Sequence, residues 1–249
     1  MRDGNDMRVI GVDACRRGWV AVSLEVSRLP DRTPRMVAVR VDGSLASVLD
    51  QADRVPARVV GIDMPLGLLE SGWREADRVA RGLLGPRRSS VFAIPPRAVW
   101  AQLSYPAANQ LCRELTGQGL SAQAWGLRAK LLEANQYREA CEHPMYEVHP
   151  ELAFGAMAGA PLDYSKHTAA GRELRRELLA RAGIALPASL SGTIPGTRSA
   201  GCYGAAPVTD TLDAAAVAWS AGRIATGQAV ILPDRPQRDS QGRQITIRY

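Results

Sequence analysis

Apolar residues occur in short runs of strand length along the first part of the chain. Residues 8–13, 19–26 and 35–41 are three such runs, separated by polar segments that contain turn-forming residues. Runs of this length between turn residues are typical of buried β-strands, and short links between consecutive strands favour antiparallel pairing. We therefore predict that the chain begins with a three-stranded antiparallel meander.

The pattern then changes to helical spacing and back again. Residues 44–52 carry apolar side chains at helical intervals, and Ser44 is placed to cap the N-terminus of the helix. An apolar run follows at 58–63 and is stopped by Pro65. A strand, a crossover helix and a further strand favour a parallel pair with a right-handed connection. The run at 58–63 can therefore lie beside the first strand.

The middle of the chain differs from both flanks because it is rich in arginine and largely helical. Helices are predicted at 70–85 and within 104–142, and the proline-broken segment 86–100 between them is expected to be irregular. No linker marks this stretch as a separate domain. We interpret residues from about 70 to 142 as a helical insertion within one domain that spans residues 1–249.

The last part of the chain is predicted to contain a buried strand, a basic helix, a loop and a long final helix. These elements occupy residues 145–149, 168–182, 187–207 and 210–227. The strand is expected to end at Pro150, and the tail beyond the final helix to add a terminal strand. The order of elements predicts an α/β fold with a mixed sheet, made of an antiparallel meander plus parallel strands and flanked by helices.

Charge adds one indication about a partner. The chain has 249 residues, of which 46% are hydrophobic, and it carries 31 Lys and Arg against 25 Asp and Glu, for a net charge of +6. Its only lysines are Lys130 and Lys166, so nearly all the positive charge is arginine. Arginine binds phosphate through parallel hydrogen bonds, which suits a nucleic-acid partner. A compositional bias that replaces lysine by arginine throughout is the alternative explanation.

Cysteine usage and the N-terminus bear on the compartment. The four cysteines are far apart, form no C-x-x-C pair and do not have zinc-site spacing to histidine. The first residues contain no apolar signal region, and no apolar run approaches the length of a membrane span. We expect a protein of the reducing cytoplasm, without a membrane partner.

Two aspartates interrupt apolar strands. Asp13 and Asp63 each stand at the end of a predicted buried strand. Burying a carboxylate costs several kcal/mol unless it is paired or binds a cation. If the two strands are neighbours, they lie about 4.8 Å apart, close enough for both carboxylates to share one divalent metal. For Asp63 the alternative is a turn-starting residue before Met64 and Pro65.

A further acidic pair opens the final helix. Asp210 and Asp213 are three residues apart, so they project from one face, and the alanines behind them allow the helix to lie close to a sheet. Oxygen ligands alone suit Mg²⁺ or Mn²⁺ rather than zinc. The alternative is that Asp210 is an N-cap and that Asp213 is a first-turn acid favoured by the helix dipole.

The order of these acids is similar to that of RNase H-like nucleases, especially Holliday-junction resolvases. More closely, the chain resembles the family called domain of unknown function 429 (DUF429), whose members are predicted RNase H-like nucleases. The segments that carry the resemblance are 11–22, 61–68, 74–81, 86–99, 116–127, 146–154 and 209–219. The resemblance implies an RNase H-like fold, but the family has no settled activity.

Two further sets of residues are candidates. Glu147, on the strand at 145–149, is a candidate catalytic or metal-binding acid, and the alternative is an acid paired with an arginine. Arg87, Arg88, Ser89 and Ser90 follow the first predicted helix of the insertion and are candidates for binding the phosphate of a substrate. Arg78, on that helix, is a further candidate. The alternative for this set is an ordinary solvated loop.

Together these features favour metal-dependent phosphodiester hydrolysis. Asp13, Asp63, Asp210 and Asp213 would bind Mg²⁺ or Mn²⁺, and arginines of the insertion would hold a nucleic acid or another phosphate-bearing substrate. One alternative is a small-molecule phosphoryl-transfer enzyme on the same fold. Another is a non-catalytic binding protein in which the acids form a structural cation site.

Overall fold

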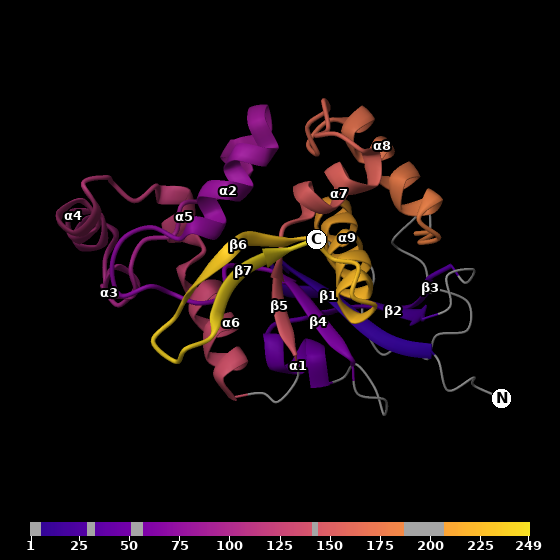
Figure 1. Cartoon of the computed structure of the whole chain (residues 1–249), viewed down its shortest axis with the longest axis horizontal. Coiled ribbons are helices and arrows are strands. Elements are labelled where there is room, and N and C mark those ends of the chain that lie inside the picture. Colours follow the sequence, from indigo (N-terminus) through magenta and orange to yellow (C-terminus); the bar gives the residue numbers. More distant parts are fainter. Residues whose placement is uncertain (1–5, 29–32, 51–56, 141–143, 187–206) are drawn as a thin grey trace. The chain divides into compact units, whose positions relative to one another are not determined.

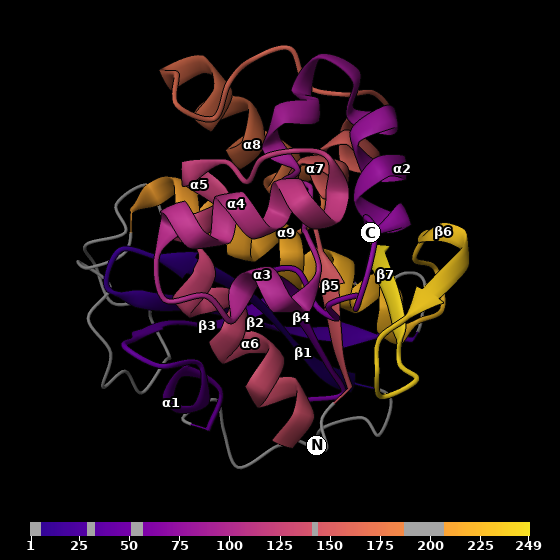
Figure 2. The ribbon, with the colours of Figure 1, turned by 90° about the vertical axis from the view of Figure 1, so that its left-hand side faces the viewer.

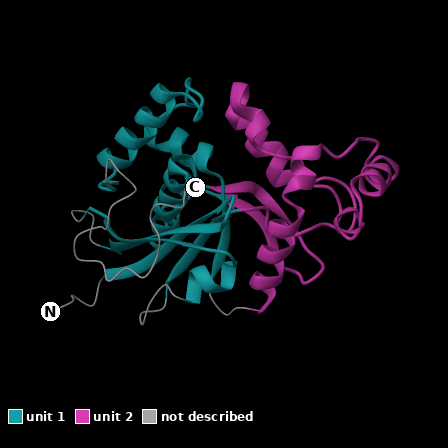
Figure 3. Cartoon of the chain, turned by 180° about the vertical axis from the view of Figure 1, so that it is seen from behind, with its two compact units in different colours: residues 1–63, 142–230, 248–249 teal, residues 64–141, 231–247 magenta. Residues whose placement is uncertain are grey.

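The computed structural model describes residues 6–28, 33–50, 57–140, 144–186 and 207–249. The chain divides into two compact units (Figure 3). Unit 1 comprises Met1–Asp63, Glu142–Val230 and Arg248–Tyr249, and unit 2 comprises Met64–Cys141 and Ile231–Ile247. The insertion expected at about 70–142 accounts for most of unit 2. Unit 2 also takes in a C-terminal segment that the sequence did not associate with it.

Unit 1 is built on five strands in the order β3-β2-β1-β4-β5. Their bounds are β1 Asp6–Cys15, β2 Gly18–Ser27, β3 Arg35–Asp42, β4 Val59–Asp63 and β5 Met145–Val148. Strands β1, β2 and β3 pair antiparallel, whereas β4 runs parallel to both β1 and β5 (Figure 1). The predicted mixed sheet, with its meander and its parallel strands, is confirmed.

Four helices belong to unit 1: α1 Leu45–Asp50, α7 Pro150–Ala158, α8 Ala169–Arg181 and α9 Val208–Ala225. Ser44 caps α1 as predicted, because its hydroxyl accepts a hydrogen bond of 3.1 Å from the Ser47 amide. Helix α7 was not predicted. Pro150, expected to end a strand, also begins this helix, since a proline at the first helical position gives up no intrahelical hydrogen bond.

The core of unit 1 lies between the sheet and helices α7, α8 and α9. Fully buried side chains from the strands, such as Val9 and Leu24, pack with Phe154 of α7 and Leu179 of α8. Helix α9 contacts β1, β2 and β4, and Figure 1 shows it running across them. Its alanines contribute many of the buried positions, so the last helix is a core element rather than a surface one.

Unit 2 contains the remaining helices and a pair of strands (Figures 1 and 2). They are α2 Glu75–Leu84, the 3-10 helix η1 Gly85–Ser90, α3 Arg97–Trp100, α4 Tyr105–Thr116, α5 Ala122–Gly126, α6 Arg128–Ala140, β6 Ile231–Arg238 and β7 Gln244–Arg248. The segment 86–100 is thus more regular than expected, because it includes most of η1 and all of α3. The tail forms two strands rather than one, joined by a turn in which the Asp239 amide donates to the Arg243 carbonyl.

Two expectations about the rest of the chain remain. The loop expected at 187–207 lies, apart from Pro207, outside the described residues. Among the helices of the described ranges, none is long and apolar enough to cross a membrane.

Candidate functional site

Asp13 and Asp63 stand side by side at the carboxyl ends of β1 and β4. In the parallel register Asp13 pairs with Asp63, and Gly11 pairs with Gly61. Side chains alternate between the two faces of a strand, so these four positions share one face. Neighbouring strands lie about 4.8 Å apart, which brings the two aspartates into direct proximity. The sequence showed only that the two strands could be neighbours; the structure places them side by side.

Helix α9 covers the same face of the sheet at very short range. A Cβ atom added to Gly11 would lie 2.0 Å from the Ala218 amide nitrogen and 2.3 Å from the Ala214 carbonyl oxygen. A Cβ atom on Gly61 would lie 3.0 Å from a methyl group of Val217. Small residues on both sides thus allow backbone to contact backbone. The first turns of α9 are consequently held near the ends of β1 and β4.

The close packing of α9 on the sheet brings Asp213 near the two strand aspartates, and Asp210 lies at the edge of this group. Asp213 is 1% exposed and Asp13 is 7% exposed. Asp210 is less buried and accepts a 3.2 Å hydrogen bond from the Thr209 hydroxyl. No side-chain hydrogen bond caps the start of α9, so the N-cap role considered for Asp210 is not what it does.

The electrostatics of these acids reflect their crowding. Burial raises the pKa of Asp13 well above its ordinary value, and the charges of Asp63 and Asp213 raise it further. Burial, followed by the charge of Asp213, raises the pKa of Asp63 to about 7. Burial also raises the pKa values of Asp213 and Asp210. Carboxylates in this state favour either a proton or a nearby cation.

A lysine supplies part of the missing positive charge. The Lys166 ammonium lies 2.5 Å from an Asp213 carboxylate oxygen, and its side chain is 36% exposed. Although burial by itself lowers the pKa of Lys166, the charges of Asp213, Asp63 and Asp13 raise it above its ordinary value. Sequence reasoning missed this residue. The available signal was that a chain with almost no lysine retains one here.

A second missed group is a buried ion pair. The Arg175 guanidinium of α8 donates a 2.6 Å hydrogen bond to Glu151 of α7, and Arg175 is fully buried. The charge of Glu151 contributes to raising the pKa values of Asp63 and Asp213, so this pair borders the acidic site. Glu151 lies in the first turn of α7, the helix that the sequence did not predict, and no local signal marked it.

Glu147 does not join these acids. The register of β4 with β5 pairs Glu147 with Ile62, the residue before Asp63. Adjacent residues of a strand point to opposite faces, so Glu147 lies on the face of the sheet opposite Asp13 and Asp63. It is 6% exposed. The structure therefore separates Glu147 from the predicted catalytic set.

The candidate phosphate-binding residues all belong to unit 2. Arg88, Ser89 and Ser90 of η1 are exposed, Arg87 is half-buried, and the Ser90 hydroxyl donates a 2.8 Å hydrogen bond to the Arg87 carbonyl. Arg78 of α2 makes two hydrogen bonds to the Glu75 carboxylate, one of them 2.8 Å long. Arg78 is thus paired within its own helix.

The chemistry of the acidic site can be compared with the needs of a metal ion. In the part of the chain that the structure describes, no three His, Cys, Asp or Glu side chains stand ready to hold a metal. The donor types nevertheless suit a hard cation, because they are all carboxylate oxygens and are short of positive charge. As the side chains stand, the cation beside Asp213 is the ammonium of Lys166.

The fold and the site together define a class, an α/β protein with a mixed sheet and acids gathered at the ends of its strands. The chain belongs to the family described as "Protein of unknown function (DUF429)", whose profile matches residues 11–238. This confirms the resemblance seen in the sequence. No curated protein matches the chain in sequence.

One solved structure is similar in shape. The Thermus thermophilus RuvC structure aligns with a TM-score of 0.41 and 18% sequence identity, covering 89% of this chain and 98% of that chain. A likeness this distant carries no argument about activity, so the function has to be inferred from the site itself.

Proposed function

We propose that the protein is a metal-dependent phosphodiesterase of the nuclease type, with Asp13, Asp63, Asp210 and Asp213 as its catalytic acids. The register of Asp13 with Asp63 beneath α9 is the main support, since it collects buried carboxylates on one face of the sheet. Their raised pKa values mean that the arrangement opposes folding at neutral pH. Groups perturbed in this way are typical of functional sites.

The proposed cofactor is Mg²⁺ or Mn²⁺, held by the same four aspartates. Such an ion, when bound, activates water for attack on a phosphodiester and stabilises charge on the leaving oxygen. Asp13 takes the central place, because the charges of Asp63, Asp213 and Asp210 all act on it. Lys166 limits the repulsion among these acids while a cation is absent, and it offers a positive group to a phosphate that approaches Asp213.

The proposed substrate is a nucleic acid or another phosphate-bearing molecule. The chain has a net charge of +6, and nearly all of its positive charge is carried by arginine, which favours a polyanionic partner. Arg87 and Arg88 of η1, with Ser89 and Ser90, are the proposed phosphate-holding group of unit 2. Arg78 can contribute only after it releases Glu75, so we assign it a lesser part.

A specific observation favours an alternative, a non-catalytic protein with a purely structural ionic cluster. The contact between Lys166 and Asp213 already gives the acids a cation of their own. In that case divalent metals would bind weakly and the acids would only hold the ends of β1, β4 and α9 together.

The deciding experiment compares Asp13→Asn with the matched control Asp234→Asn, an exposed acid on β6. Binding of Mn²⁺ is measured by calorimetry, and hydrolysis of single-stranded DNA, duplex DNA, RNA and ATP is assayed in parallel with Mn²⁺. We expect Mn²⁺ binding and one metal-dependent hydrolysis, both abolished by Asp13→Asn and unchanged by the control. Hydrolysis of ATP alone would point to small-molecule chemistry, and absence of Mn²⁺ binding would leave the structural cluster.

A further inference from the structure

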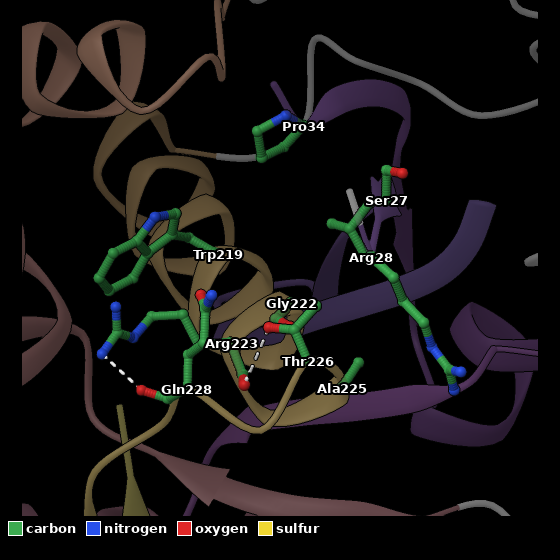
Figure 4. A pocket seen from close by; sticks show the side chains of 10 residues that line it. Ser27, Arg28, Pro34, Trp219, Gly222, Arg223, Ala225, Thr226 and Gln228 are labelled. Atoms are coloured by element: carbon green, nitrogen blue, oxygen red, sulfur yellow. Dashed lines mark hydrogen bonds between the residues drawn. The ribbon is translucent and has the colours of Figure 1, made fainter. Parts of the chain in front are cut away.

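A second site lies at the other end of α9. A pocket of about 510 Å³ is lined by the C-terminal half of α9 and the residues just after it, by the end of β2, and by Arg28 and Pro34, which lie just after β2 and just before β3 (Figure 4). Its volume falls in the range of about 300–1,000 Å³ that small-molecule sites occupy. At about 1.5 Å per residue, Thr226 in its wall lies about 20 Å along the helix axis from Asp213. The pocket is therefore distinct from the acidic site.

The charges around this pocket are of one sign. Arg28 and Arg223 line it, and none of its ten lining residues is acidic. Figure 4 shows the side chains of Arg28 and Trp219 on opposite sides of the pocket, contributed by different elements. Hydroxyl and amide groups of Ser27, Thr226 and Gln228 complete the polar part of the wall. This composition suits an anion that also carries hydrogen-bonding groups.

Arg223 retains hydrogen-bonding capacity. One of its terminal nitrogens donates a 2.7 Å hydrogen bond to the Gln228 carbonyl, and its guanidinium lies 4.8 Å from the centre of the Trp219 ring. Its Nε atom is buried and has no hydrogen-bond partner among the described residues. A buried donor without an acceptor is unfavourable, so an acceptor brought by a ligand would remove that cost.

The end of α9 does not oppose an anion as a bare helix C-terminus would. The Thr226 hydroxyl and the Thr226 amide each donate a 3.0 Å hydrogen bond to the Gly222 carbonyl. The Arg223 carbonyl accepts a 2.7 Å hydrogen bond from the Gln228 amide. These carbonyls, which carry the negative end of the helix dipole, are thus already occupied by donors.

We propose that this pocket binds a nucleoside monophosphate unit. The phosphate is held by Arg28, and the planar base packs on the opposite side of the pocket against Trp219, which Arg223 holds in place from one side. The unit is either a free nucleotide or one nucleotide of a single strand. The proposal does not depend on the acidic site, so loss of hydrolysis in Asp13→Asn leaves nucleotide binding here unaffected.

The test uses the whole chain in EDTA, so that no metal takes part. Calorimetry measures the affinity of AMP, GMP, CMP and UMP, with inorganic phosphate as a second arm and a short single-stranded oligonucleotide as a third. Arg28→Ala removes a proposed phosphate contact, and Ala225→Phe fills the pocket from the end of α9. Arg235→Ala, an exposed arginine of β6 outside the pocket, is the matched control. Thermal unfolding verifies that each variant is folded.

We expect at least one nucleotide to bind about tenfold more weakly to Arg28→Ala than to the wild type and the control, as fits the loss of one charge-assisted contact. The same nucleotide should also bind more weakly to Ala225→Phe, because the new ring occupies the pocket. If only the oligonucleotide binds, with the same losses, the ligand is a nucleotide within a strand. Inorganic phosphate binding as tightly as every nucleotide would overturn the proposal. So would equal affinities in the pocket variants and the control, or no binding in any arm.

Discussion

The ammonium group of Lys166 lies 2.5 Å from a carboxylate oxygen of Asp213, a residue 47 positions later in the chain. This contact joins the loop before α8 to the second turn of α9. It places a permanent positive charge beside carboxylates that burial and mutual repulsion leave poorly stabilised as anions. Lys166 and a divalent ion would therefore favour the same ionised state of the acids.

Replacing this lysine should weaken the metal-free protein. At about pH 8 in EDTA, Lys166→Gln should lower the free energy of unfolding by about 2 kcal/mol, less than the 3–5 kcal/mol of a fully buried pair because the lysine side chain is 36% exposed. Mn²⁺ should stabilise Lys166→Gln more than it stabilises the wild type, because the Lys166 ammonium no longer repels the bound cation. Urea unfolding with and without Mn²⁺ measures both effects.

Lys130→Gln is the matched control, since Lys130 is the other lysine of the chain and forms a longer, 3.5 Å pair with Glu133 in which both side chains are partly exposed. A partly exposed pair of this length, three residues apart on one helix, contributes roughly 0–1 kcal/mol, so this variant should lose less stability than Lys166→Gln. Equal effects of the two substitutions would show that the position of Lys166 beside the acids has no special importance.

The raised pKa of Asp63 predicts a pH dependence of stability. Folding moves this pKa from 3.8 to about 7, so between these values the folded state binds more protons than the unfolded state. Stability in EDTA should consequently fall as the pH rises from about 4 to 7, by at most roughly 4 kcal/mol, and should not change further for this reason above that window.

Asp63→Asn isolates this contribution, because the variant has no carboxyl group to titrate at that position. The unfolding free energies of both proteins are measured in urea at about pH 4.5, 6 and 8. The value for the variant minus the value for the wild type should increase as the pH increases. A difference that stays constant with pH would mean that Asp63 ionises normally in the folded protein.

Asp13 should also oppose folding when no metal is present. Asp13→Asn removes one charge from a group of mutually repelling acids, so the metal-free protein should gain about 1–2 kcal/mol at neutral pH. For a chain of this size that corresponds to a rise in Tm of roughly 3–6 °C. Thermal unfolding in EDTA, with Asp234→Asn as control, measures this rise in Tm. A marked loss of stability in Asp13→Asn would instead favour a structural role for Asp13.

The close contact of α9 with β1 should make Gly11 irreplaceable. In Gly11→Ala the new Cβ atom would lie 2.0 Å from backbone, which neither the strand nor the helix can relieve without moving apart. We expect a loss of roughly 3 kcal/mol or more and a parallel loss of Mn²⁺ affinity. Gly43→Ala, where a Cβ atom meets nothing within 4 Å, should be close to neutral. Similar stabilities of the two variants would contradict this account of how α9 is placed.

The arginines of η1 should contribute to binding through charge alone. If Arg87 and Arg88 contact phosphates, their joint replacement by Ala should weaken nucleic-acid binding equally for all sequences and reduce the salt slope by about 2, one unit per contact. Affinity measured against salt concentration tests this. Joint replacement of Arg113 and Arg235, exposed arginines of α4 and β6, should change the slope much less. An unchanged slope in the η1 variant rejects the phosphate-holding role.

Local sequence patterns determined most of the secondary structure and the main acids of the site. Strand-length apolar runs predicted all five strands of unit 1, because burial on both faces of a sheet leaves a continuous apolar signature. The same principle singled out Asp13, since a carboxylate within a buried strand is conspicuous. The alanines of the final helix indicated a close approach to the sheet, and the contact at Gly11 bears this out.

Tertiary structure decided which polar residues meet at the acidic site beneath α9. The pairing register put Asp13 beside Asp63 and turned Glu147 to the opposite face, since a shift of a single position along a strand reverses the direction of a side chain. Lys166 and Glu151 reach the acids from segments far away in the sequence. Their presence depends on the packing of α7 and α9, which brings distant parts of the chain together in ways that no local periodicity encodes.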